Sequence, residues 1–278
     1  MKTRILPISD VHLERRTLKD IPALDQSFDL LVCAGDTWEG QPERAVQSVV
    51  DIAQEKRAIM VAGNYDFYSY TISDVIRRMR KEADRQNAQA SREIVTVLSA
   101  DCPVCVINQT RFIGLMLWTD WAQAGRWMAD PTGAVEWAAR AREGAVDMAL
   151  REYRAIKTER GLWTPYDAVA EHAREKAILL DHLVSEHDGP TVVRPTVVVT
   201  HHPPLGVIAD AYRATGVPWW APAFYASDIL PTLREYMQPK LWICGHVHAP
   251  FDSRRGRTRV VCNPIEGGNF NPNLIIKV

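Results

Sequence analysis

The sequence predicts an α/β fold in which a buried sheet carries helices on its faces. Residues 4–9, 28–34 and 57–62 form short, nearly continuous apolar runs. Such runs are typical of strands covered on both faces, because a half-exposed strand would alternate apolar and polar residues. Residues 42–56 lie between the second and third runs and carry apolar residues at helical spacing. Strands and helices therefore alternate along the chain, as in an α/β protein.

The next segments continue this pattern. Residues 71–90 read as a charged surface helix. Three further strands are expected over residues 94–98, 104–107 and 112–117. From about residue 119 to 190 the chain is rich in Ala, Arg, Glu and Trp, with few β-branched runs. We expect two or three helices there, the last over residues 165–187, ended by Asp188-Gly189-Pro190.

Strand character returns in the last third of the chain. Strands are expected over residues 196–200 and 241–244, and a closing strand over residues 274–278. A helix is expected over residues 227–237, with Ser227 as its N-cap and Pro239 just beyond its end. Residues 251–253 and 258–262 flank Arg254-Arg255-Gly256-Arg257, which reads as a hairpin turn. The 278 residues suffice for one large core. We therefore expect a single domain over residues 1–278, with residues 119–190 as a mainly helical insertion.

Composition excludes several classes of protein. The formal net charge of −1 provides no global basic field for nucleic acid or an anionic membrane, although a locally basic groove would permit nucleic acid binding. No stretch approaches the ~18 apolar residues of a membrane span, and residues 1–7 lack the apolar core of a signal peptide. Five cysteines, an odd number, fit reduced thiols in the cytoplasm. Cys102 and Cys105 have the spacing of half a zinc ribbon, but the second pair is missing. The sequence does not set the oligomeric state.

Five short motifs carry residues that bind metal ions, and each directly follows an apolar strand. In open α/β sheets, sites form outside the carboxyl ends of the strands, so the motifs can converge in space. Taken singly, each has an ordinary reading as a turn, a cap or a surface loop. Their joint occurrence, with five of the eight histidines, indicates a metal site instead. The motifs are Asp10-Val11-His12, Gly35-Asp36, Gly63-Asn64-Tyr65-Asp66, His201-His202-Pro203-Pro204 and Gly245-His246-Val247-His248.

The ligand types suit a pair of divalent ions. Imidazole serves Zn, Fe, Ni and Mn, whereas carboxylate and amide oxygens suit harder ions such as Mn, which we favour. In Asp10-x-His12 and His246-x-His248, side chains two apart on an extended segment would point the same way. Asp36 is the natural carboxylate to bridge two ions about 3.5–4 Å apart. Asn64 would supply an amide oxygen.

The order of these motifs resembles that of the calcineurin-like metallophosphoesterases, over residues 10–248. The chain is most similar to a bacterial branch of small phosphoesterases, through Leu117-Trp118-Thr119-Asp120, Tyr225-Ala226-Ser227-Asp228 and residues 259–264. The resemblance implies a four-layered α/β/β/α sandwich with two metals at the strand ends. It implies that one metal is held by Asp10, His12, Asp36 and His248. The other is then held by Asp36, Asn64, His201 and His246.

The chemistry that two such metals provide is hydrolysis of phosphate esters. The ions lower the pKa of a bridging water, and the resulting hydroxide attacks phosphorus while the ions neutralise the phosphoryl charge. No Ser-His-Asp arrangement is identifiable. The family commonly has His in the Gly-Asn-His-Glu/Asp motif as the group that protonates the leaving oxygen, but this chain has Tyr65. Tyr65, His202 and Asp66 are therefore the candidates for the general acid that protonates the leaving oxygen. Asp66 also reads as a carboxylate that orients a metal-binding histidine.

Several other residues allow two readings. The tryptophans are either an aromatic lid that stacks a flat leaving group or core residues, with core preferred for each alone. We expect the Trp219-Trp220 pair to line the pocket. The arginines of the 254–259 hairpin either contact phosphate or are solvated, with the second preferred. Asn263 either contacts substrate or forms a turn. The tryptophans are Trp118, Trp121, Trp127, Trp137, Trp163, Trp219 and Trp220, and the arginines are Arg254, Arg255, Arg257 and Arg259.

We therefore expect a dinuclear-metal hydrolase of a small-molecule phosphate ester. The insertion and Tyr65 favour phosphodiesters. The alternatives are a phosphomonoesterase, a nuclease of the same chemistry and a non-catalytic scaffold of the same fold. The nuclease would need a basic groove, which the net charge of −1 does not favour. The scaffold would have lost ligands, whereas all seven are present.

Overall fold

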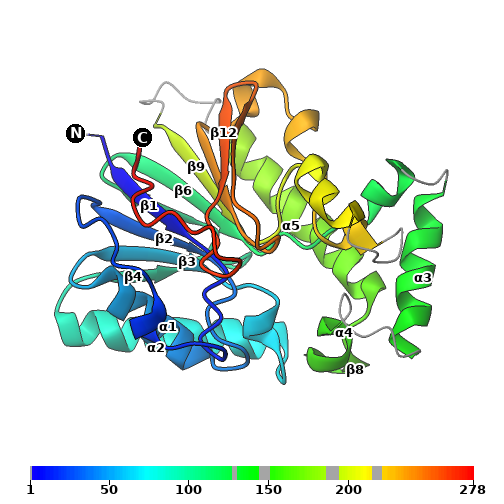
Figure 1. Ribbon diagram of the computed structural model, residues 1–278, viewed down its shortest axis with the longest axis horizontal. Helices are drawn as coiled ribbons and strands as arrows, with labels where there is room; N and C mark the ends of the chain where they lie inside the picture. The colour runs from blue at the N-terminus through cyan, green and yellow to red at the C-terminus, as the bar shows by residue number, and fades with distance from the viewer. Residues whose placement is uncertain (1, 127–129, 144–150, 186–193, 215–220) are drawn as a thin grey trace.

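The computed structural model describes residues 2–126, 130–143, 151–185, 194–214 and 221–278. Its framework is a pair of sheets that lie face to face (Figure 1). The first has the strand order β13-β1-β2-β3-β4, with β13 antiparallel to β1 and the other neighbours parallel. Its strands are β1 (Arg4–Ile8), β2 (Leu30–Ala34), β3 (Arg57–Val61), β4 (Val95–Val97) and β13 (Ile276–Lys277).

The second sheet has the strand order β11-β12-β10-β9-β6-β5. The four inner strands run parallel, and β5 and β11 pair antiparallel at the two edges. Parallel inner strands direct all their carboxyl ends to one edge, which is where the sequence places its metal motifs. The strands are β5 (Val104–Ile107), β6 (Thr110–Leu115), β9 (Thr196–Thr200), β10 (Leu241–Cys244), β11 (Phe251–Arg255) and β12 (Thr258–Cys262).

Side-chain alternation along β2 explains why the two sheets stack. Leu30, Val32 and Ala34 point into the layer between the sheets, where they meet Val197 and Val199 of β9. The intervening Leu31 and Cys33 point the other way, toward the helices. Successive side chains of a strand alternate between faces, so a continuous apolar strand packs against two layers at once.

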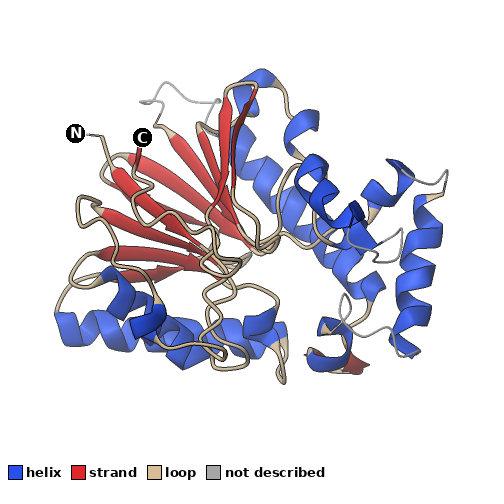
Figure 2. Cartoon of the chain, viewed as in Figure 1, coloured by secondary structure: helices blue, strands red, loops and turns tan. Residues whose placement is uncertain are grey.

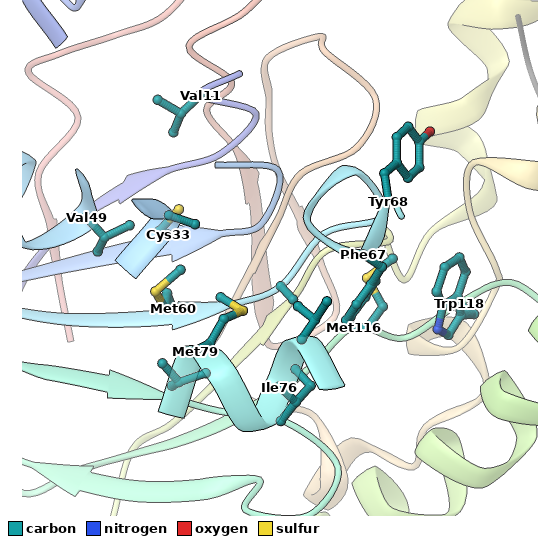
Figure 3. Packing of buried hydrophobic residues seen from close by; sticks show 14 of the residues in the cluster. Val11, Cys33, Val49, Met60, Phe67, Tyr68, Ile76, Met79, Met116 and Trp118 are labelled. Atoms are coloured by element: carbon teal, nitrogen blue, oxygen red, sulfur yellow. The ribbon is translucent and has the colours of Figure 1, made fainter. Parts of the chain in front are cut away.

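Helices complete the sandwich on its outer faces. α1 (Pro42–Ala53) and α2 (Ile72–Ala90) cover the first sheet, and α5 (Pro165–Ser185) covers the second through Leu179 and Leu183. Figure 3 shows the packing beneath α2, where Met79 and Ile76 lie close to Met60 and Phe67. The order helix, sheet, sheet, helix is the four-layered α/β/β/α sandwich that the family resemblance implies.

The described residues between β6 and β9 are mainly in helices, and the predicted helix over residues 165–187 is present as α5. Figure 2 shows these helices to one side of the sheets. They are α3 (Pro131–Glu143), α4 (Glu152–Ala155) and α5. A small antiparallel pair, β7 (Lys157–Thr158) and β8 (Gly161–Leu162), lies between α4 and α5. Short 3-10 helices connect other elements: η1 (Leu18–Asp20), η2 (Tyr65–Phe67), η3 (Ala122–Arg126), η4 (Gly206–Ala214), η5 (Ala221–Phe224), η6 (Leu230–Thr232) and η7 (Glu235–Met237). Among the described helices, none has the length and apolar character needed to cross a bilayer.

The prediction of a helix over residues 227–237 is wrong. The segment forms η6 and η7, separated by extended backbone at Leu233 and Arg234. Pro231 lacks the N–H that would make the first hydrogen bond of a helix capped by Ser227. Instead, the Ser227 hydroxyl accepts a hydrogen bond from the Asp120 backbone N–H at 3.1 Å. Burial of Leu230 and Leu233 against the second sheet fixes the two short turns.

One smaller difference concerns the closing strand. The closing strand is shorter than residues 274–278, because Leu274 and Ile275 make local turn hydrogen bonds with Asn271 and Asn273. Cys102 and Cys105 lie around the start of β5. Both are free thiols, and neither belongs to a group of described residues that could hold a metal ion.

Candidate metal centre

Seven candidate ligands lie at the carboxyl ends of five strands, where the two sheets meet (Figure 1). Asp10 and His12 follow β1, Asp36 follows β2 and Asn64 follows β3, all from the first sheet. The second sheet supplies the remaining three, His201 after β9 and the pair His246 and His248 after β10. Parallel pairing brings these strand ends together even though the motifs are up to 238 residues apart in the sequence.

The ligand atoms form two groups. Those of Asp10, His12, Asp36 and His248 lie within 4.8 Å of one another, and so do those of Asp36, His201 and His246. The Asn64 Oδ1 lies 3.0 Å from the His201 Nε2, which places it with the second group. Asp36 belongs to both groups, as expected for a bridging carboxylate. Its Oδ2 lies 3.8 Å from the His12 Nε2 and 3.3 Å from the His201 Nε2.

The burial of these atoms and their missing hydrogen-bond partners fit a pair of cations. Asp10, His12, Asp36 and His201 are fully buried. Buried polar atoms are costly without a partner, yet Asp10 Oδ2, Asp36 Oδ2 and His246 Nε2 have no hydrogen-bond partner in the described part of the chain. The Nε2 atoms of His12 and His248 face each other at 3.2 Å. A mixed imidazole, carboxylate and amide set of this kind is suited to Mn, Fe, Zn or Ni.

The carboxylate of Asp36 is in the state that metal binding requires, whereas His201 must lose a proton: burial opposes its protonation, but Asp36 outweighs burial and raises the pKa of His201 to about 9. Burial opposes ionisation of Asp36, but the neighbouring His201 and His12 outweigh it and lower the pKa of Asp36 to about 2. Burial holds the pKa of His246 well below its usual range, so its imidazole is neutral. Metal ligation requires ionised carboxylates and neutral imidazoles.

The ligand backbone departs from the conformation that the sequence suggests. The prediction that each Asp-x-His or His-x-His pair lies on an extended segment is wrong. Asp10, His12, His246 and His248 all have φ between 46° and 70°, and so does Asp36. Left-handed backbone at residues other than glycine is strained, at about 1 kcal/mol or more each, and concentrates at functional sites. The side chains converge because the loops turn sharply at each ligand, and not because of strand pleating.

Residues behind the ligands fix the geometry. Glu14 Oε1 lies 2.7 Å from the His12 Nδ1, and the Ala34 carbonyl lies 2.8 Å from the His201 Nδ1. Each contact orients an imidazole so that Nε2 faces the centre, as is usual at metal sites. Gly63 is needed for close approach, since a Cβ there would overlap the Asp36 Oδ1.

Asp66 has a different role from the one expected of a histidine-orienting carboxylate. Its two oxygens accept four backbone N–H groups, from Asp36, Gly63, Thr37 and Trp38, at 2.8–3.2 Å. It therefore ties the loop after β2 to the loop after β3. No imidazole of the described residues forms a hydrogen bond with this carboxylate; the imidazoles of His12 and His201 are oriented by Glu14 and the Ala34 carbonyl instead.

A cavity of about 390 Å³ opens on the metal centre. Of the three candidate acid residues, only Tyr65 is among the described residues that line it. The Tyr65 ring meets the His12 ring edge-on at 4.6 Å, and its hydroxyl accepts a hydrogen bond from Arg15 at 3.2 Å. His202 is 1% exposed, and its ring lies 4.1 Å from that of His246 and 5.6 Å from that of Trp118. His202 therefore packs behind the ligands.

The remaining wall of the cavity contains residues that sequence reasoning missed. Arg15, Arg151 and the buried Glu152 line it, together with Tyr68, Phe224 and Tyr225. Arg15 follows the first motif within three residues, a position that could have drawn attention to it. Arg151 and Glu152 lie in the helical segment, where nothing in the sequence distinguishes them from other charged residues.

The other residues for which the sequence allowed two interpretations lie where they serve the structure or are exposed to solvent. Trp118, Trp121 and Trp163 are buried in the core, and Trp137 is half-exposed on α3. The arginines at 254, 255, 257 and 259 lie on the β11–β12 hairpin, and Arg259 pairs with Asp252. Asn263 is buried and donates to the carbonyls of Pro7 and Asn271, which fits the turn reading. Trp127, Trp219 and Trp220 lie outside the described residues.

Comparison with known proteins supports this fold. No protein-family model matches the sequence, and no curated protein matches it. The chain is similar in structure to the phosphopantetheinyl hydrolase PptH from Mycobacterium tuberculosis, with a TM-score of 0.64 and 17% identity over 100% of this chain and 96% of that one. A second solved structure gives a TM-score of 0.52 and 14% identity, covering 94% of this chain and 90% of that one. With its two stacked sheets, outer helices and strand-end ligand groups, the chain has the fold of the calcineurin-like metallophosphoesterases.

Proposed function

We propose that this protein is a metal-dependent hydrolase of phosphate esters that acts on small-molecule phosphodiesters. The observation that carries the proposal is the pair of ligand groups that share the buried Asp36. The shared carboxylate supports two ions side by side, and unpartnered ligand atoms point toward them. The similar structure PptH bears the name of a phosphopantetheinyl hydrolase, which agrees with this class of reaction.

Two divalent ions would supply an activated water and would neutralise charge on the phosphoryl group. The chain itself would position them: Asp36 between the groups, Glu14 behind His12 and Asp66 across the two loops. Manganese is the ion we favour, with Fe, Zn and Ni as the other candidates. Five free cysteines fit a reducing compartment such as the cytoplasm.

Tyr65 is the residue we propose as hydrogen-bond donor to the leaving oxygen. It lines the cavity beside His12 and stands where the family commonly has histidine. Its hydroxyl accepts from Arg15, which leaves the phenol proton free to point into the cavity. The aromatic walls of the cavity favour an organic group on each side of phosphorus, hence a diester.

The test is hydrolysis of bis-p-nitrophenyl phosphate and p-nitrophenyl phosphate by protein loaded with Mn or another divalent ion. We expect the diester to be cleaved faster, and metal analysis to find two ions per chain. Faster cleavage of the monoester would make the protein a phosphomonoesterase. No activity on either ester would refute the proposal, and less than one ion per chain after metal addition would favour a scaffold.

Asp36→Asn serves as the matched variant. It keeps the size of the side chain but removes the charge that both groups share. We expect it to lose one or both ions and to lose activity by about three orders of magnitude. Salt-sensitive binding of single-stranded DNA would instead favour a nuclease.

A further inference from the structure

We propose that Arg15 and Arg151 form a second anion-binding subsite beside the metal centre. It would bind an additional phosphoryl or carboxylate group of the substrate, apart from the phosphoryl group that is cleaved. This inference rests on the proposed function, because the scissile group is taken to lie at the metals. It narrows the substrate to phosphate esters that carry a second anionic group.

The two arginines converge on one aromatic ring. The guanidinium carbons of Arg15 and Arg151 lie 5.4 and 5.5 Å from the centre of the Tyr65 ring. That of Arg151 also lies 5.2 Å from the ring of Tyr68, which stacks on Tyr65. Since Tyr65 meets the His12 ring at 4.6 Å, one ring separates the arginines from a metal ligand. Arg15 follows β1 and Arg151 precedes α4, so only the fold brings them together.

Each arginine is also held by a carboxylate. Arg15 Nη1 donates to Glu266 Oε1 at 2.5 Å, and Arg151 Nη2 donates to Glu39 Oε1 at 2.6 Å. Neither glutamate is among the described residues that line the cavity, whereas both arginines are. Glu39 therefore restrains Arg151 from outside the cavity, whereas Glu266 links Arg15 to the ligand groups, because its Oε2 lies 3.6 Å from the His12 Nε2. A guanidinium has five N–H donors in a planar fork, so donors remain for a ligand.

The exposure of the charged groups favours an anion at this place. The side chains of Arg15 and Arg151 are 41% and 47% exposed, so their donors are open to a ligand. Glu152 is the carboxyl group among the described lining residues, and it is only 1% exposed. An approaching ligand therefore meets the arginines first. Forked contacts from arginine are the strong form of phosphate and carboxylate recognition.

The spacing argues for a group distinct from the one that is cleaved. Tyr65 and Tyr68 form an aromatic surface between His12 and the arginines. A phosphoryl group at the ligand atoms would have the Tyr65 ring between it and the guanidinium groups. The half-buried Tyr65 ring offers an apolar surface for the segment that connects the two anionic ends of the substrate.

The experiment compares ligands with one and two anionic ends. Binding of inorganic phosphate, pentane-1,5-bisphosphonate and 6-phosphonohexanoate is measured by calorimetry on the full chain with metal in excess. The five methylene groups of each two-ended ligand allow it to pass the Tyr65 ring, which lies between the arginines and His12. We expect at least one two-ended ligand to bind more tightly than phosphate. Preference for pentane-1,5-bisphosphonate identifies a phosphoryl partner, and preference for 6-phosphonohexanoate identifies a carboxylate. Charge-assisted hydrogen bonds predict that Arg15→Gln and Arg151→Gln each weaken the two-ended ligand by about tenfold or more, with phosphate unchanged.

Arg254→Gln is the matched control, because Arg254 is exposed on the β11–β12 hairpin. It should bind every ligand as the parent protein does. Thermal melting confirms that the variants fold, since both cavity arginines are partly exposed. If the double variant Arg15→Gln/Arg151→Gln keeps the full preference for two-ended ligands, the subsite is refuted and the proposed function stands. If the metal-loaded parent protein binds no ligand at all, both proposals fail.

Discussion

Glu175 on α5 is a buried acid whose ionisation the fold opposes. It is 4% exposed and accepts a hydrogen bond from the Leu117 backbone N–H. Burial, with a smaller contribution from Glu171, raises the pKa of Glu175 to about 8 from an ordinary value of 4.5. It lies outside the metal motifs, so its effect on stability can be measured separately from metal binding.

The sign of the effect follows from proton linkage. Between pH 4.5 and pH 8 the unfolded chain has released this proton while the folded chain keeps it. The contribution of protonated Glu175 to the free energy of unfolding is fully present below pH 4.5 and is lost as the pH rises through 8. The free energy of unfolding should fall by about 1.4 kcal/mol per pH unit across this window. The loss is about 3 kcal/mol at pH 7.

Glu175→Gln should remove this pH-dependent loss of stability, and the glutamine keeps a carbonyl oxygen that can accept the hydrogen bond from the Leu117 N–H. We expect the variant to be more stable than the parent by about 2–3 kcal/mol at pH 7, and by less than about 1 kcal/mol at pH 5. The measurement is urea unfolding of both proteins at pH 5, 6, 7 and 8. Glu136→Gln, exposed on α3, is the control and should show no such trend. A difference that does not change with pH would refute the reasoning.

Three further substitutions test the support of the metal centre. Glu14→Gln weakens the contact that orients His12, so metal affinity in a chelator competition should fall by about 10–100-fold; unchanged affinity would contradict this role. Gly63→Ala places a Cβ against Asp36, so metal content and the unfolding midpoint should both fall, whereas Gly133→Ala on α3 should lower neither. Asp66→Asn replaces one of the two accepting oxygens by an N–H donor, which faces two backbone N–H groups. It should cost about 2–3 kcal/mol in urea unfolding, and a cost near zero would show that the loops hold without it.

Much of the site could be predicted because its chemistry is local in sequence. Each ligand motif directly follows an apolar strand. The carboxyl ends of parallel strands all lie at the same edge of the sheet, so the motifs are brought to one place. The motif around Asp36 therefore indicated both its position and its place between two ligand groups. Continuous apolar runs such as β2 likewise indicated a strand packed on both faces, and Leu31 and Val32 do point into different layers.

Other features depended on contacts that no local pattern records. The helix expected over residues 227–237 was displaced by burial of Leu230 and Leu233, which is a tertiary effect stronger than helix propensity. The left-handed backbone at His12 and His246 is strained in isolation and persists because the surrounding packing and ligand geometry impose it.

The sequence by itself determined the class of fold and singled out the residues that the structure gathers into two candidate ligand groups. Strand periodicity and metal-binding residue types are properties of short segments, so they can be read without coordinates. The tertiary structure alone decided what surrounds the metals. Arg15 and Arg151 meet over Tyr65 because the α4 region packs beside the segment that follows β3, through hydrogen bonds of Ala155 with Ser69 and of Lys157 with Tyr70. Contacts between segments so far apart follow from packing of the chain as a whole, and short sequence patterns do not record that packing.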